Sequence, residues 1–160
     1  MALKRTKMAR KPLNRTKTGK VSTAPKKKRV KALSVSKLKK QLEALQKQVV
    51  LKLYGNDCYT CDAKDLQGSN CHLGHVPWPR TDLSIQAKFD YRYTRAQCFR
   101  DNIHLGGAGA KAYARMQAEG IDMIMLREYA DEGKGKPVPR SWYESKMAEY
   151  KAILLSTDTI

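Results

Sequence analysis

Four side chains that could bind a metal ion stand in two pairs in the middle of this 160-residue sequence. Cys58 and Cys61 are separated by two residues, which is the spacing of a chelating knuckle. Cys98 and Asp101 repeat that spacing, with a carboxylate where a second thiolate would be expected. Because Zn²⁺ prefers four tetrahedral ligands of these types, we predict that the four residues form a structural zinc site.

Two other side chains could replace the carboxylate as fourth ligand, namely Cys71 and His104. In either case a zinc ion would supply much of the folding energy of so small a core. We therefore expect about one bound zinc per chain and a lower melting temperature in the presence of chelators.

A second group of polar side chains could carry out hydrolysis. His72 and His75 end an extended segment directly before Pro77, and Asn102 follows the second pair of proposed zinc ligands. A histidine can take a proton from water, while oxygen or nitrogen donors hold a divalent ion against a phosphate. By themselves these residues fit polar surface positions or auxiliary zinc ligands equally well.

Local patterns predict the elements that must position these residues, in a small α+β fold. Apolar residues three and four apart predict an amphipathic helix over 34–54, with Ser34 or Ser36 as N-cap and Gly55 as its end. Extended segments are predicted around Cys71–Val76 and Ala87–Tyr93. Later helices are predicted over Asn102–Glu119, from Asp122 to about Tyr129, and from a capping box at Ser141–Glu144.

Charge is distributed very unevenly along the chain. The first 40 residues hold 16 of the 32 Lys and Arg and no acidic residue, whereas the remaining 120 hold 16 basic and 15 acidic residues. A low-complexity segment of this kind cannot build a core, so we expect residues 1–33 to form a disordered basic arm. Such an arm favours nucleic acid as partner, because binding phosphates releases counterions. The candidate phosphate ligands in the arm include Lys26, Lys27, Lys28 and Arg29.

The composition also limits where the protein acts. No apolar run approaches the roughly 20 residues of a membrane span, and the N-terminus lacks the hydrophobic segment of a signal peptide. We therefore expect an intracellular protein with reduced thiols and no membrane partner. Pro25–Val30 reads like a nuclear import signal, which leaves the nucleus as an alternative location.

Several short motifs, in this order, resemble the NinG (Rap) family of phage recombination endonucleases. They are Cys58-x-x-Cys61, Gly74-His75-Val-Pro-x-x-Arg80, Lys88-Phe-Asp90, Arg95-Ala-Gln-Cys98-x-x-x-Asn102 and Gly106-Gly-Ala-Gly109. The basic arm, the opening of the first helix and the tyrosine-rich last helix are also similar to that family. The resemblance thus covers most of the chain.

The resemblance implies a zinc-braced ββα-metal (HNH-like) module over residues 55–120, followed by a C-terminal helical segment over 121–160. It also implies a metal-dependent endonuclease for branched DNA, such as Holliday junctions or D-loops, in the cytoplasm of an infected bacterium. By position, His75 would be the general base and Asn102 a ligand of a catalytic Mg²⁺ or Mn²⁺, with His72 as a further ligand. Arg80 and Arg95 are candidates for phosphate contacts or for solvated surface positions.

Three positions depart from the family pattern. The second knuckle ends in Asp101 where the family has cysteine, His72 stands where an acidic residue is common, and Tyr93 replaces an asparagine. The alternative function is therefore a zinc-knuckle nucleic-acid-binding protein that has lost cleavage. A homodimer is a further expectation, because nucleases that cut two strands often pair and the stripe of residues 35–53 could form the contact.

Overall fold

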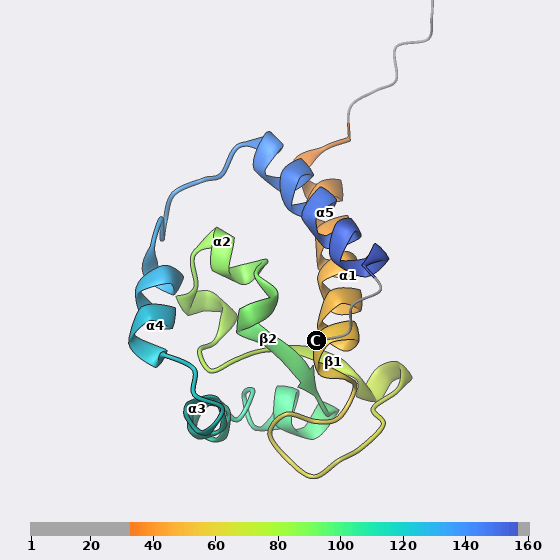
Figure 1. The fold of residues 1–160 in the computed structure, drawn as a ribbon, viewed down its shortest axis with the longest axis vertical. Helices are drawn as coiled ribbons and strands as arrows, with labels where there is room; N and C mark the ends of the chain where they lie inside the picture. The colour runs from red at the N-terminus through yellow and green to blue at the C-terminus, as the bar shows by residue number, and fades with distance from the viewer. Residues whose placement is uncertain (1–32, 157–160) are drawn as a thin grey trace, which may run out of the picture. The chain divides into compact units, whose positions relative to one another are not determined.

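The computed structural model describes residues 33–156 (Figure 1). The predicted basic arm lies outside the described residues, and so do Lys26, Lys27, Lys28, Arg29 and the Pro25–Val30 motif. The fold is a helix-rich α+β arrangement, which confirms the predicted class. Its principal elements are α1 (Val35–Tyr54), β1 (His72–His75), α2 (Ile85–Lys88), β2 (Thr94–Gln97), α3 (Gly109–Ala118), α4 (Met123–Asp131) and α5 (Arg140–Leu155).

The first helix follows the prediction closely. The Ser34 hydroxyl accepts a hydrogen bond from the Lys37 amide at 3.4 Å, and Gly55 ends α1 with a positive φ of 75°. The apolar face of α1 is buried against α5, which runs alongside it in Figure 1. Because α5 covers this stripe, its buried residues are not free to form a dimer contact in this fold, and the homodimer itself stays a prediction.

Helix α5 runs in the same direction as α1, and side chains connect the two at both ends. The Arg140 guanidinium donates to the Leu33 carbonyl at 2.6 Å, before α1 begins. At the other end the Lys52 ammonium donates to the Ile153 carbonyl at 2.8 Å, at the electronegative C-terminus of α5. The predicted capping box is absent, because α5 begins directly after Pro139 without a side-chain cap.

The two strands form an antiparallel hairpin in which His72 pairs with Gln97 and His75 with Thr94. The second strand was misplaced by the sequence, since Ala87–Tyr93 is a short helix and a turn instead of an extended segment. The Ser84 hydroxyl accepts a bond from the Ala87 amide at 3.2 Å and caps α2. These local hydrogen bonds satisfy the backbone before the strand begins at Thr94.

The predicted helix over Asn102–Glu119 is divided in two. A single π-helical turn spans Arg100–His104, and α3 begins only at Gly109. A Cβ at Gly109 would lie 2.6 Å from the Pro77 carbonyl oxygen, so the start of α3 approaches the loop after β1 too closely for a side chain. The π-helical turn therefore stands alone between β2 and α3, directly beside the cysteines.

Candidate metal centre and adjoining groove

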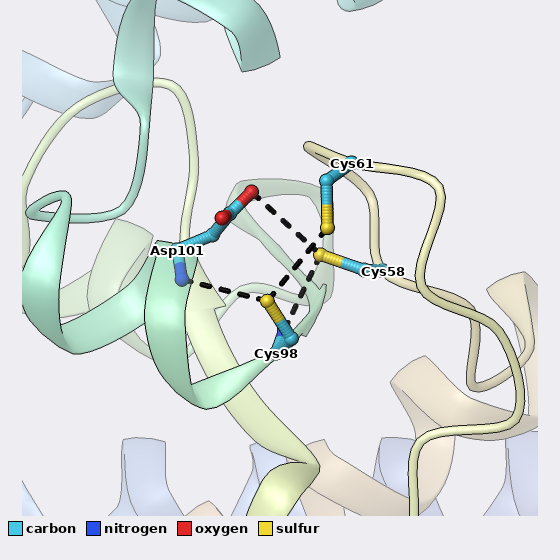
Figure 2. Close-up of side chains that lie close together, drawn as sticks. All are labelled: Cys58, Cys61, Cys98 and Asp101. Carbon is cyan, nitrogen blue, oxygen red and sulfur yellow. Dashed lines mark hydrogen bonds between the residues drawn. The ribbon is translucent and has the colours of Figure 1, made fainter.

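Cys58, Cys61, Cys98 and Asp101 converge on one point, as predicted (Figure 2). Their candidate ligand atoms all lie within 4.8 Å of one another. The sulfur atoms of Cys61 and Cys98 are 3.7 Å apart, which matches the edge of about 3.8 Å expected for a tetrahedron with Zn–S bonds of about 2.3 Å. These residues therefore form a cluster that could hold a metal ion.

The local electrostatics of the cluster fit a cation. Burial works to raise the pKa of the Cys58 thiol, but hydrogen bonds from the Cys98 amide and from Thr60 lower it to about 7. The Ala63 amide lowers the pKa of Cys61, yet burial and the neighbouring thiols raise it to about 12. One thiolate thus suppresses ionisation of the next, and a bound dication removes that repulsion.

Asp101 is fully buried and still favours its charged form. Burial acts to raise the pKa of its carboxyl, whereas the Thr60 hydroxyl at 2.8 Å and the Arg100 guanidinium at 3.2 Å outweigh that effect and lower it. A charged carboxylate is the form that ligates zinc, so the replacement of the usual cysteine leaves a usable donor.

A buried amide links this cluster to the turn before α3. The Gln97 side chain donates to the Thr60 hydroxyl at 3.2 Å and to the Gly107 carbonyl at 2.7 Å. The Gln97 amide fills the space that a side chain at position 74 would need, because a Cβ at Gly74 would lie 1.8 Å from Oε1 of Gln97. No role is predicted for Gln97 or Thr60 from the sequence, because both lie within the cysteine motifs but neither has a metal-ligating side chain of the expected type.

The two alternative fourth ligands stay outside the cluster. Cys71 is buried in the apolar core behind it, and His104 is an exposed residue of the π-helical turn. Within residues 33–156, the four residues in Figure 2 are the one group of His, Cys, Asp and Glu side chains close enough to share an ion. Asp101 is therefore the fourth candidate ligand.

His75 lines a groove of about 570 Å³ between α1 and β1. Its Nε2 lies 3.1 Å from the Lys88 carbonyl oxygen, which can only accept a proton, so Nε2 carries the hydrogen and Nδ1 the lone pair. The buried Gln46 amide donates to the same carbonyl at 3.2 Å and holds it in place. No sequence pattern points to Gln46, because it lies on the buried face of α1 among apolar residues.

The surroundings of His75 keep its imidazole neutral at neutral pH. Burial is the main cause of a lowered pKa, the Lys88 carbonyl opposes it, and the nearby Arg80 guanidinium lowers the pKa further. A neutral imidazole with a free Nδ1 lone pair can act as a general base.

The groove also carries charged side chains on both walls. Lys47 and Glu43 project from α1, and Arg80 projects from the loop after β1 and pairs with Glu43. Both members of that ion pair are about half exposed, so it is worth no more than about 1 kcal/mol. A phosphate could therefore replace Glu43 as the partner of Arg80 at little energetic cost.

The structure does not bring His72 together with His75. Residues three apart on a strand point to opposite faces, and His72 binds the Ser69 carbonyl at 2.9 Å on the face away from the groove. Asn102 is half-buried in the π-helical turn and is not among the residues that line the groove. Among the three predicted catalytic residues, His75 alone lines it.

Arg95 is not a phosphate ligand, contrary to one of the two sequence-based alternatives, and it is not a surface residue either. It is 4 % exposed, and its guanidinium lies 3.7 Å from the centroid of the Tyr54 ring. It also donates to the Thr94 carbonyl at 2.9 Å. Arg95 therefore holds the end of α1 to β2, which the sequence alone could not show.

Tyr93, which departs from the family pattern, is a core residue. Its ring is fully buried and stacks on Tyr129 at a centroid distance of 6.1 Å, and its hydroxyl donates to the Leu126 carbonyl at 2.6 Å. The tyrosine thus attaches the turn before β2 to α4.

No protein-family model, no characterised protein and no solved structure matches this chain significantly. Within the described residues, none of the helices is both long enough and apolar enough to cross a membrane. The case for a function therefore depends on the site itself.

Proposed function

We propose that this chain is a metal-dependent endonuclease that hydrolyses phosphodiester bonds of branched DNA, with His75 as general base. The observation that carries the proposal is the state of His75 in the groove. Its Nε2 is bound to the Lys88 carbonyl, its pKa is lowered, and Arg80 and Lys47 line the same groove as potential phosphate ligands. A neutral base in a groove that also holds cationic groups suits a reaction of water with a phosphate.

The order of the elements supports an HNH-like module. The hairpin of β1 and β2 is followed by the π-helical turn and α3, and the metal cluster joins the loop before β1 to the residues just after β2. We propose Zn²⁺ for that cluster, because three thiolates and one carboxylate at tetrahedral spacing suit this ion. Its role would be structural, since all four candidate positions are taken by protein ligands.

In the proposed reaction, Nδ1 of His75 takes a proton from a water molecule in the groove. The oxygen of that water attacks phosphorus, the 3′-oxygen leaves, and Arg80 exchanges Glu43 for the negative charge on the phosphate. A divalent Mg²⁺ or Mn²⁺ ion would supply charge neutralisation at the phosphate. The predicted ligand Asn102 does not line the groove, so substrate oxygens and water would be the main ligands of the ion there, and such ions use few protein ligands.

One observation favours the alternative, a zinc-knuckle nucleic-acid-binding protein without cleavage. His72 points away from His75, so the described residues do not assemble the predicted set of His72, His75 and Asn102. Under this alternative the groove would bind phosphate, and His75 would serve only as a polar contact.

Incubation with a synthetic four-way junction and a linear duplex of the same sequence separates the two functions. The endonuclease is expected to cut the junction in Mg²⁺ or Mn²⁺ and to stop when these ions are withdrawn. Zinc must be retained throughout, so the comparison uses omission of the added ion instead of a strong chelator. Junction binding without cutting under both ions would contradict the endonuclease and favour the alternative.

A further inference from the structure

An exposed aromatic group lies on the opposite face of β1 from the groove. Phe99 stands between the ligands Cys98 and Asp101 and is 45 % exposed, although phenylalanine is ordinarily buried. The His72 ring lies 5.5 Å from it, and the His104 ring packs edge-on at 5.2 Å. We call these three side chains the aromatic platform.

Two further exposed apolar side chains lie next to the platform residues in the chain. Ile103 and Leu105 flank His104 in the chain and are 53 % and 50 % exposed. Three exposed apolar side chains therefore fall within seven residues of the chain, beside the two histidine rings.

The platform is held rigidly. The Phe99 amide donates to the Asn70 side chain at 2.9 Å, and the His72 ring is fixed by its bond to the Ser69 carbonyl. The metal ligands Cys98 and Asp101 hold the backbone on either side of Phe99. A rigid aromatic ring binds a partner without a large loss of conformational entropy.

The chemistry around the ring selects the kind of partner. His72 and His104 bring ring nitrogens beside Phe99, and the next residue, Arg100, has a side chain that is 66 % exposed. An aromatic face with hydrogen-bond donors and positive charge at its edge fits a nucleobase attached to phosphate, not a hydrocarbon surface. Only an unpaired base offers a free face for stacking.

We infer that the aromatic platform stacks on an unpaired nucleobase of the DNA substrate. This inference rests on the proposed function, because it assumes that DNA is the ligand. It gives His72 a role in substrate contact in place of metal binding. His72 and His75 are three strand residues apart, about 10 Å along β1, and they point to opposite faces of the strand, so the DNA would have to pass round the hairpin to contact both sites. Such a contact would favour branch points over continuous duplex.

The test compares the full chain with Phe99→Ala and Phe99→Trp, without added Mg²⁺ or Mn²⁺ so that cleavage plays no part. The probes are an oligo-dT single strand and a linear duplex, each carrying a fluorescent label. Binding is measured by fluorescence anisotropy at one salt concentration. We expect Phe99→Ala to weaken single-strand binding about tenfold and to leave duplex binding unchanged. Phe99→Trp should bind the single strand as tightly as the unaltered protein. Tyr113→Ala, an exposed aromatic residue on α3, is the matched control and should bind both probes normally.

A second readout reports stacking directly. The fluorescence of a 2-aminopurine base in the single strand should be quenched by the unaltered protein and not by Phe99→Ala. Equal binding by Phe99→Ala, or an equal loss for both probes, would overturn the inference. So would a loss of self-association in Phe99→Ala by sedimentation with unchanged DNA binding, because the patch would then contact protein.

The outcomes for the inference and for the proposed function are separable. Binding that depends on Phe99 without any cleavage would refute the endonuclease and keep the platform. Cleavage together with single-strand binding that is unchanged in Phe99→Ala would refute base stacking on the platform and leave the proposed endonuclease in place. Unchanged melting of Phe99→Ala would confirm that the variant is folded, as its exposure leads us to expect.

Discussion

Replacement of Asp101 by cysteine tests the metal centre at its most unusual ligand. The wild-type cluster offers three thiolates and one carboxylate, so Asp101→Cys would offer four thiolates. In the Co²⁺-loaded protein, sulfur-to-metal charge-transfer absorbance should therefore rise by about one third. Affinity for zinc should rise as well, because a thiolate is the preferred donor.

The same substitution should destabilise the metal-free protein. The buried Asp101 carboxylate accepts a hydrogen bond from the Thr60 hydroxyl at 2.8 Å, and a thiol replaces that bond poorly. A buried hydrogen bond to a charged group contributes about 1.5–3 kcal/mol, so the free energy of unfolding without metal should fall by about that amount. The substitution thus weakens the apo form and strengthens metal binding.

The assay is absorbance of the Co²⁺-loaded protein combined with competition for zinc by a chromophoric chelator. Asp101→Asn is the matched control, because it keeps the shape and the three thiolates but removes the charge. It should show wild-type charge-transfer intensity with weaker zinc affinity. If Asp101→Cys showed wild-type intensity, or if Cys71→Ser lowered it, residue 101 would not be the fourth ligand.

Three further predictions follow from the same structure. Removing the metal from the wild type should lower the free energy of unfolding by about 4 kcal/mol, which is the stabilisation expected when the free ion concentration is about 1,000 times the dissociation constant. An unchanged melting temperature in calorimetry, together with no zinc by elemental analysis, would refute this prediction. Tyr150→Phe should lower the free energy of unfolding, measured by denaturant titration, by about 2–4 kcal/mol, because the buried hydroxyl donates to the Phe89 carbonyl and accepts from the Tyr91 amide at 3.1 Å. The exposed Tyr113→Phe is the control, and equal stabilities of the two variants would count against the prediction. Protonation of His75 should leave the cleavage rate unchanged at neutral pH and lower it only below about pH 6.5, because the lowered pKa keeps the base neutral above that value. A loss of rate already between about pH 8 and pH 7 would contradict a lowered pKa.

Features set by short-range chemistry could be predicted from the sequence. Ser34 and Gly55 bound α1 through local hydrogen bonds and backbone geometry, and the paired spacing of Cys58 with Cys61 was enough to indicate the cluster. The first strand, His72–His75, also lies within the predicted extended segment Cys71–Val76. In each of these cases the deciding interaction lies within a few residues of the chain.

The remaining features depend on contacts between distant residues. The sequence predicts that Arg95 is a phosphate ligand or a solvated surface residue, because no residue near it in the chain indicates its contact with the ring of Tyr54 at the end of α1. Gln46 and Gln97 gained their roles from carbonyl groups of other elements. The start of β2 was misplaced because the turn chemistry of Asp90, which accepts a bond from the Arg92 amide at 2.9 Å, overrides the β-propensity of the tyrosines.

The most direct test of the central claim is the single-turnover rate of junction cleavage by His75→Ala with the DNA fully bound. The structure predicts unchanged junction affinity and zinc content but a rate at least about 100-fold lower, because general-base catalysis contributes about 10²–10⁴-fold. Gln41→Ala, an exposed position on α1, should cut at the wild-type rate. If His75→Ala cut the bound junction as fast as the wild type, His75 would not be the base and the proposed site would be wrong.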